Sequence, residues 1–94
     1  MQRHSLKLLG TSHCHLCEEA EAILKQALSH GDFQNNILLQ KIDVIDHDNL
    51  YALYALKIPV LLFTKENATL ELHWPFAEDE MKDFLTKALS QGKI

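Results

Sequence analysis

The chain has 94 residues, 47% of them hydrophobic and 23% charged, which is the composition of a small globular domain and excludes a mainly disordered chain. Thirteen acidic residues against nine basic ones give a formal net charge of −4, which argues against a nucleic-acid partner because such partners require a basic face. The longest wholly apolar run, residues 58–63, is too short to span a bilayer, and the N-terminal segment lacks the apolar run of a signal peptide. We therefore expect one domain over residues 1–94, located in the cytoplasm, without a membrane partner.

The N-terminal half of the sequence predicts two strands joined by a helix. Residues 6–9 are a short apolar run that ends at Gly10, and residues 37–44 are rich in branched apolar side chains, so both segments favour strands. Gly31 is a suitable stop for the helix between them. The apolar positions of that helix recur at helical spacing: Leu16, Ala20, Ile23, Leu24, Ala27 and Leu28.

Residues 46–57 predict a second helix, whose start Asp46 or Asp48 could cap. Its apolar face is expected to contain Leu50, Leu53 and Tyr54.

The C-terminal part predicts a hairpin and a last helix. Pro59 has no N–H for a sheet ladder, so it should precede a buried strand at residues 60–63. Residues 70–74 alternate between apolar and polar side chains, which is typical of a strand at a sheet margin. Residues 77–92 predict an amphipathic helix that ends before Gly92 and has an inner stripe of Met81, Phe84, Leu85, Ala88 and Leu89.

The predicted order is β-α-β-α-β-β-α, which defines an α/β fold. The first β-α-β unit should be parallel with a right-handed crossover, and the last two strands should be antiparallel. The result is a four-stranded mixed sheet flanked by three helices.

Cys14 and Cys17 stand three residues apart where the first strand leads into the first helix. A C-x-x-C motif also occurs in zinc and iron–sulfur proteins, but its position here favours redox chemistry. Unpaired N–H groups at a helix start stabilise a thiolate, so Cys14 is the expected nucleophile. Cys17 lies one helical turn further on, where its sulfur can close a disulfide with Cys14 and release a bound substrate.

Two alternatives to redox chemistry remain open for these cysteines. They could be inert and buried, because free cysteine often packs as a small hydrophobe. They could also hold a metal together with His13 and His15. Adjacent residues do not easily converge on one tetrahedral ion, and the sequence has no second ligand pair of the usual spacing.

His13 and His15 flank the first cysteine and are candidate modulating residues. Most histidines at such positions are simply solvated. A protonated His15 would stabilise the Cys14 thiolate, whereas Glu18 and Glu19 would repel it.

The whole chain resembles the thioredoxin fold, and glutaredoxins in particular. The segments "HCHLCEEA", "IDV", "IPVLLF" and "LHWPF" are similar to a small glutaredoxin-like family once catalogued only as a domain of unknown function. This resemblance implies that Pro59 is cis and packs beside the cysteine pair. It also implies that the Ile58 backbone binds an extended substrate segment, and that Asp43 ends the second strand.

The sequence departs from ordinary glutaredoxins in two places. Its motif is C-H-L-C where theirs is C-P-Y-C, and Trp74 and Pro75 stand where they carry a Gly-Gly turn that binds glutathione. We therefore expect no cofactor, with glutathione only a doubtful co-substrate whose carboxylate would meet Lys7 or Lys57. The "WPF" segment itself is expected to close the core, with a substrate platform as the alternative.

The function predicted from the sequence is reversible thiol–disulfide exchange through Cys14 and Cys17, in a monomer. The expected partner is a disulfide-containing protein or a small thiol. The alternatives are a thioredoxin-fold interaction scaffold with little exchange activity, and a metal or iron–sulfur carrier that uses the same cysteines.

Overall fold

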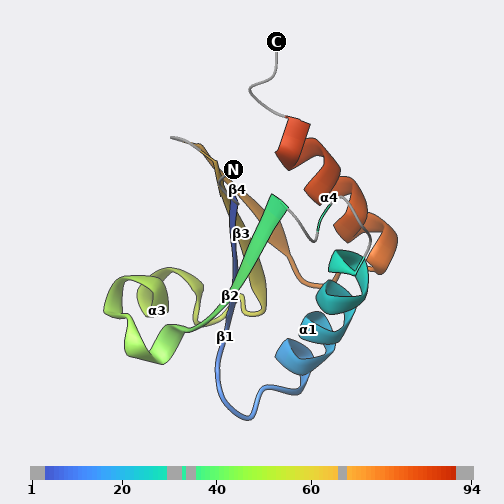
Figure 1. Ribbon diagram of the computed structural model, residues 1–94. Helices are drawn as coiled ribbons and strands as arrows, with labels where there is room; N and C mark the ends of the chain where they lie inside the picture. The colour runs from blue at the N-terminus through green and yellow to red at the C-terminus, as the bar shows by residue number, and fades with distance from the viewer. Residues whose placement is uncertain (1–3, 30–32, 34–35, 66–67, 91–94) are drawn as a thin grey trace.

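The computed structural model describes residues 4–29, 33, 36–65 and 68–90 (Figure 1). Their regular elements are β1 (His4–Gly10), α1 (His15–Leu28), β2 (Ile37–Asp43), the 3-10 helix η1 (Val44–Asp46), α3 (Asp48–Tyr54), β3 (Val60–Lys65), β4 (Ala68–His73) and α4 (Glu78–Ser90).

The four strands form one mixed sheet in the order β2-β1-β3-β4. β1 runs parallel to β2 and antiparallel to β3, and β4 runs antiparallel to β3. Helices α1 and α4 cover one face of the sheet, and α3 lies on the other (Figure 1). The predicted fold, a four-stranded mixed sheet flanked by three α-helices, is confirmed for the described residues.

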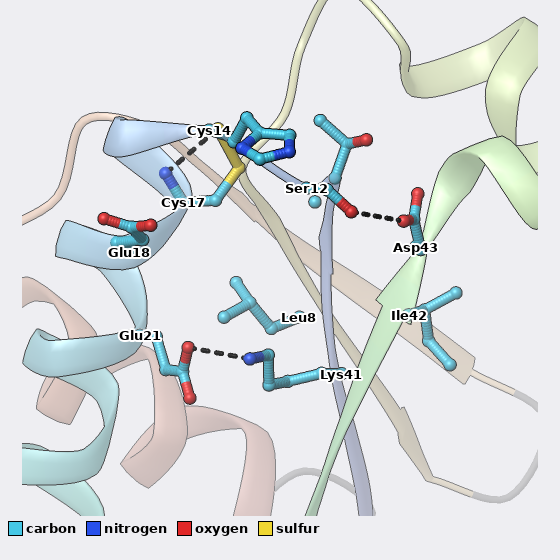
Figure 2. A pocket seen from close by; sticks show the side chains of 12 residues that line it. Leu8, Ser12, Cys14, Cys17, Glu18, Glu21, Lys41, Ile42 and Asp43 are labelled. Carbon is cyan, nitrogen blue, oxygen red and sulfur yellow. Dashed lines mark hydrogen bonds and ion pairs between the residues drawn. A yellow bond between two sulfur atoms is a disulfide. The ribbon is translucent and has the colours of Figure 1, made fainter.

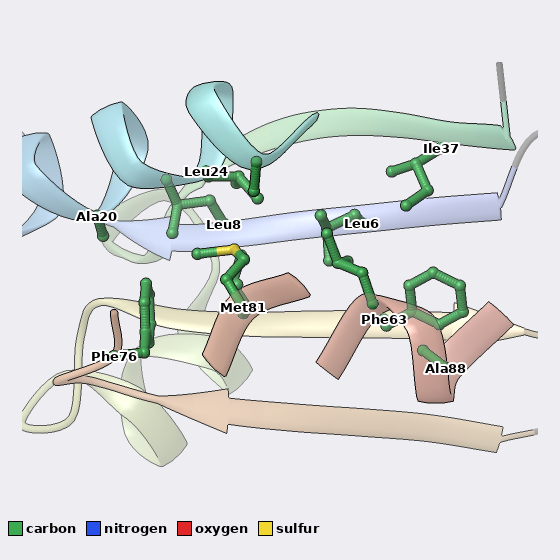
Figure 3. Packing of buried hydrophobic residues seen from close by; sticks show 12 residues of the cluster. Leu6, Leu8, Ala20, Leu24, Ile37, Phe63, Phe76, Met81 and Ala88 are labelled. Carbon is green, nitrogen blue, oxygen red and sulfur yellow. The ribbon is translucent and has the colours of Figure 1, made fainter. Parts of the chain in front are cut away.

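The larger hydrophobic core lies between the sheet and the helix pair α1 and α4 (Figure 3). Leu6 and Leu8 of β1 and Phe63 of β3 are buried against Leu24 of α1 and Met81 of α4. Full burial of one such side chain contributes about 1.5–3 kcal/mol, so this layer holds both helices on the sheet. The predicted inner stripe of α4 faces this core, with Met81, Leu85 and Ala88 buried and Phe84 and Leu89 packed against them.

A smaller core lies on the face that carries α3. Its buried residues are Leu9, Val44, Val60 and Leu62, and Ile42, Leu50, Tyr54 and Ile58 pack around them. Leu9 and Val60 also pair in the sheet register, so this core reaches the edge at which β1 ends and β3 begins.

Two leucines predicted to face inward are exposed. The buried face of α1 contains Cys17 and Ala20. Leu16 lies beside this face and not on it, so its exposed fraction is 45%. Leu53 has an exposed fraction of 63%, because the short helix α3 turns Leu50 and Tyr54 toward the sheet.

The start of α3 differs from the prediction. Asp46 is the last residue of η1 and Asp48 is already helical, so His47 occupies the N-cap position, without a side-chain hydrogen bond. The chain makes a 3-10 turn first, and Asp43 caps that turn by accepting a 3.0 Å hydrogen bond from the N–H of Ile45. The helix stops predicted at Gly31 and Gly92 lie outside the described residues.

Candidate active site

The two cysteines lie at the start of α1 and are joined by a disulfide, with a Cα–Cα distance of 5.2 Å. Cys14 is the N-cap residue, with an extended backbone at φ −105° and ψ 104°, and Cys17 lies in the first helical turn. Cys17 is 8% exposed, whereas Cys14 is more accessible. An attacking substrate would therefore meet the sulfur of Cys14 first.

Backbone donors of the first helical turn point toward Cys14. The N–H of Cys17 donates to the Cys14 sulfur at 3.1 Å, and the N–H of Glu18 donates to the Cys14 carbonyl at 3.1 Å. Free N–H groups at a helix start carry partial positive charge, which stabilises a negative sulfur at this position.

The histidines beside the cysteines occupy different environments. His13 has a φ of 59°, in the left-handed region that few non-glycine residues adopt, and its backbone turns the chain from the loop into the helix. His15 is the first residue of α1, and its Nε2 lies 3.3 Å from Glu19 while its Nδ1 lies 3.9 Å from Glu18. The imidazole of His15 thus faces carboxylates. The modulating role of both histidines stays a prediction.

A pocket of about 330 Å³ opens beside the disulfide (Figure 2). It is lined by Leu8, the loop at residues 10–14, the α1 residues Cys17, Glu18 and Glu21, and residues 41–43 at the end of β2. Both sulfur-bearing residues line it, so a small molecule in this pocket would lie next to the disulfide.

Charged and polar side chains connect the walls of this pocket. Lys41 of β2 lies 3.0 Å from one oxygen of Glu21, and Lys25 lies 3.1 Å from the other. The hydrogen bond with Lys41, and then that with Lys25, lowers the pKa of Glu21 below its usual value. On the opposite wall, the hydroxyl of Ser12 donates to Asp43 at 3.4 Å. The Glu21–Lys41 ion pair thus connects α1 to β2, and the Ser12–Asp43 hydrogen bond connects the loop before α1 to the end of β2.

The segment before β3 reaches the same edge of the sheet. The Ile58–Pro59 peptide bond is cis, and Val60, which follows it, pairs with Leu9, the neighbour of Gly10. The N–H of Ile58 donates to the carbonyl of Tyr54 at 3.1 Å. The N–H of Ile58 is therefore used within the chain, and substrate binding by Ile58 and Pro59 stays a prediction.

The "WPF" segment contributes to the core. Phe76 is buried, and the ring of Trp74 meets it edge-on with 5.0 Å between ring centroids. Leu70, Leu72 and Trp74 pack against the larger core, as the alternation of residues 70–74 predicts. The Trp74–Pro75 bond is also cis. These contacts favour the core-closing interpretation of this segment.

The structure does not gather the proposed metal ligands. Within residues 4–29, 33, 36–65 and 68–90, no three or more His, Cys, Asp or Glu side chains are grouped so that they could hold a metal ion. His15 faces its neighbouring glutamates.

Two features of this edge of the sheet were not predicted from the sequence: the place of Lys41 in the pocket and the hydrogen bond between Ser12 and Asp43. Lys41 lines the pocket, whereas the lysines expected to meet glutathione, Lys7 and Lys57, do not. The position of Lys41 follows from the β1–β2 register, in which it pairs with Leu8. Asp43 does end β2 as the resemblance implies, but its bond to Ser12 has no signal in the sequence.

The sheet order and the cysteine pair at the first helix define the thioredoxin fold. The chain is similar to the N-terminal domain of SasA from Synechococcus elongatus, with 21% identity and a TM-score of 0.71 over 100% of this chain and 90% of that one. It is also similar to the germline-specific thioredoxin Deadhead from Drosophila melanogaster, with 21% identity and a TM-score of 0.66 over 90% of this chain and 80% of that one. At this level of identity the likeness establishes the fold.

A further solved structure is more similar in sequence than these two. The X-ray structure of the structural genomics target XcR50 from X. campestris is 28% identical, with a TM-score of 0.68 over 87% of this chain and 96% of that one. The Glutaredoxin-like domain (DUF836) family matches residues 5–86, so the chain belongs to that family. No curated protein matches the sequence. Among the described residues, no helix is long and apolar enough to cross a membrane.

Proposed function

We propose that this protein is a thiol–disulfide oxidoreductase in which Cys14 is the nucleophile and Cys17 the resolving residue. The observation that carries the proposal is the 3.1 Å hydrogen bond from the Cys17 N–H to the Cys14 sulfur at the helix start. The same donor that supports the disulfide state would stabilise a Cys14 thiolate after reduction.

The exchange has two steps. The Cys14 thiolate attacks a substrate disulfide, a bond forms between Cys14 and one substrate sulfur, and the other substrate sulfur leaves as a thiolate. Cys17 then loses its proton and attacks the Cys14 sulfur, which closes the Cys14–Cys17 disulfide and releases the second substrate thiolate. The protein gives up two electrons, which the substrate disulfide takes up, and the proton of Cys17 passes to one of the released thiolates. An external dithiol then restores the reduced protein.

We infer that the substrate is a protein disulfide or a small thiol compound, handled by a monomer in the cytoplasm. Glutathione is a poor candidate because three carboxylates, those of Glu18, Glu21 and Asp43, line the pocket against the single amine of Lys41. An anionic tripeptide would meet a net negative surface there.

Trapping the mixed disulfide tests the proposed roles. Reduced Cys17→Ser, mixed with an oxidised peptide disulfide, should accumulate a covalent adduct at Cys14 that mass spectrometry detects. Cys14→Ser should form no adduct, because the remaining sulfur of Cys17 is shielded. Equal adduct formation by both variants would contradict the assignment of roles, and no exchange by the unmodified protein would favour the interaction scaffold. A protein that purifies with bound iron or zinc on its cysteines would favour the carrier.

A further inference from the structure

The pocket beside the disulfide lies on the β2 side of β1. Its walls come from β1, β2, α1 and the loop at residues 10–14, and Pro59 is not among its lining residues. The strand order β2-β1-β3-β4 places β3, with the Pro59 that precedes it, on the other side of β1. A ligand in this pocket would therefore approach Cys14 from the side away from the cis proline.

The end of the pocket away from the disulfide is closed by an ion pair. Glu21 lies one helical turn beyond Cys17 in α1, and Lys41 lies two residues before the end of β2. Their side chains are 3.0 Å apart, and the second oxygen of Glu21 lies 3.1 Å from Lys25 (Figure 2). Because Glu21 is matched by two lysines, its charge is compensated within the chain.

The end of the pocket nearer the sulfurs holds two carboxylates in a different situation. Glu18 of α1 and Asp43 of β2 lie on either side of the disulfide (Figure 2). Glu18 has the imidazole of His15 at 3.9 Å, and Asp43 accepts from the hydroxyl of Ser12 and the N–H of Ile45. None of these contacts brings the charge of a lysine or arginine to either carboxylate. A ligand that carries a positive charge close to its sulfur would supply that charge.

We propose that this pocket binds small disulfides that carry an amine close to the disulfide bond, with Glu18 and Asp43 as the residues that determine this specificity. The inference rests on the proposed function and narrows its small-molecule substrates to cationic aminothiols and their disulfides. The pocket volume of about 330 Å³ is at the lower end of the range for small-molecule sites, which suits such a compact ligand. The wall formed by buried Leu8 can contact its carbon chain, while the carboxylates attract its ammonium group more strongly than bulk water would allow.

Cystamine is the simplest disulfide of this class. The Cys14 thiolate attacks one cystamine sulfur, so that a Cys14–cysteamine disulfide forms and the other cysteamine leaves as a thiolate. The ammonium group of the bound cysteamine is then two carbon atoms away from its sulfur. Cys17 loses its proton to a released thiolate and attacks the Cys14 sulfur, which displaces the second cysteamine. Dithiothreitol restores the dithiol.

Steady-state exchange by the full-length protein tests the charge preference with cystamine, its neutral N,N′-diacetyl derivative and the anionic dithiodiglycolate. Each kcat/KM is divided by the rate constant of the same disulfide with free dithiothreitol, which removes differences in intrinsic reactivity. We expect cystamine to be preferred about fivefold over its neutral derivative, and the preference to shrink at high salt. Dithiodiglycolate should be the poorest substrate. Equal values for the three disulfides, or the highest value for dithiodiglycolate, would overturn the inference.

Two variants locate the preference in the pocket. Glu18→Gln and Asp43→Asn each remove one charge and keep an oxygen that can accept a hydrogen bond, so each should lower the cystamine preference about twofold. Asp83→Asn removes a charge at an exposed position of α4 and should leave the preference unchanged. Because the preference is a ratio between two substrates of one variant, a change in the reactivity of Cys14 cancels. An equal decrease in Asp83→Asn would show an effect of net charge and contradict the assignment.

Ligand binding provides a second readout that does not depend on activity. Hexane-1,6-diamine has the shape and charge of cystamine, but a carbon–carbon bond replaces its disulfide, so it cannot exchange. Titrated into the oxidised protein, it should shift the NMR signals of the backbone amides of Glu18, Lys41 and Asp43, which the neutral hexane-1,6-diol should not do. No shift at these amides, or equal shifts at Asp83, would overturn the inference. If the unmodified protein exchanges none of the disulfides, the proposed function fails, and the titration still shows whether the pocket binds a diamine.

Discussion

A methyl group added to Gly10 would lie 3.0 Å from the sulfur of Cys17 and 3.2 Å from its Cβ. Gly10 is the last residue of β1, and Cys17 is in the first turn of α1, so the strand and the helix meet at the buried sulfur. The absence of a side chain at Gly10 thus gives Cys17 its place in the site.

Gly10→Ala is expected to destabilise the oxidised protein by about 1–3 kcal/mol, because the disulfide prevents the Cys17 sulfur from moving away from the new methyl group. Urea unfolding of the oxidised protein measures this change. In a Cys17→Ser background the smaller oxygen should relieve part of the cost, which a double-mutant cycle would detect. Additive effects of the two substitutions would contradict the contact.

Glu18→Gln should make reduction of the disulfide more favourable, because Glu18 lines the pocket beside the sulfurs and its charge opposes a thiolate. We expect the equilibrium constant with dithiothreitol to shift roughly threefold toward the dithiol, and the shift to shrink at high salt. Asp83→Asn makes the same charge change at an exposed position of α4 and serves as the control. A shift of equal size in both variants would indicate an effect of net charge alone.

The hydroxyl of Tyr54 in α3 donates a 2.5 Å hydrogen bond to the carboxylate of Glu71 in β4. This contact should make the free energy of unfolding depend on pH in two ranges. The pKa of Glu71 is lowered from 4.5, so its contribution is complete above about that pH and is lost as the pH falls through the folded-state pKa. The pKa of Tyr54 is raised from 10.0, so its contribution is complete below about pH 10 and is lost as the pH rises through the folded-state pKa.

The difference in unfolding free energy between the unmodified protein and Tyr54→Phe should therefore be level at neutral pH, at about 1 kcal/mol, and decrease at both extremes. Urea titrations from pH 3 to pH 11 measure it. Comparing the two proteins removes the contribution of other acids, such as Glu21, that titrate in both. A difference that stays constant across this range would show that the contact does not form.

The ion pair between Glu21 and Lys41 crosses from α1 to β2, whereas that between Glu21 and Lys25 stays within α1. Lys41→Met should cost about 0.2–1 kcal/mol of stability, the usual range for an exposed pair, and the loss should shrink in salt. Thermal unfolding at low and high ionic strength measures it, with Lys25→Met as the matched substitution. Because Lys41 also lines the pocket, Lys41→Met should weaken binding of anionic thiols, which Lys25→Met should not do.

The sequence was sufficient to predict features that depend on local periodicity. The inner stripe of α4 and the alternation of residues 70–74 are confirmed, because each follows from the geometry of a single element. The prediction that Leu16 faces inward was wrong. Helix α1 faces the sheet through Cys17 and Ala20, and its packing against the sheet determines this orientation. The prediction that Asp46 or Asp48 caps α3 was wrong, because η1 ends at Asp46 and His47 occupies the N-cap position.

Contacts between distant elements could not be predicted in the same way. The pairs Glu21–Lys41 and Tyr54–Glu71 depend on strand register and on the position of a short helix, neither of which local pattern determines. The pairing of Cys14 and Cys17 could be predicted because side chains three residues apart at a helix start lie next to each other. No other element is needed to bring the two sulfurs together.

The disulfide closes a loop between residues only three positions apart within one turn of chain. The loop-entropy contribution of a cross-link grows with the number of residues that it encloses, so this bond restricts the unfolded chain very little. The two hydrophobic cores, one on each side of the sheet, do not depend on this short loop, so we expect them to maintain the fold in either oxidation state. In the proposed exchange, two electrons would enter and leave at the first turn of α1 while the rest of the protein keeps its shape.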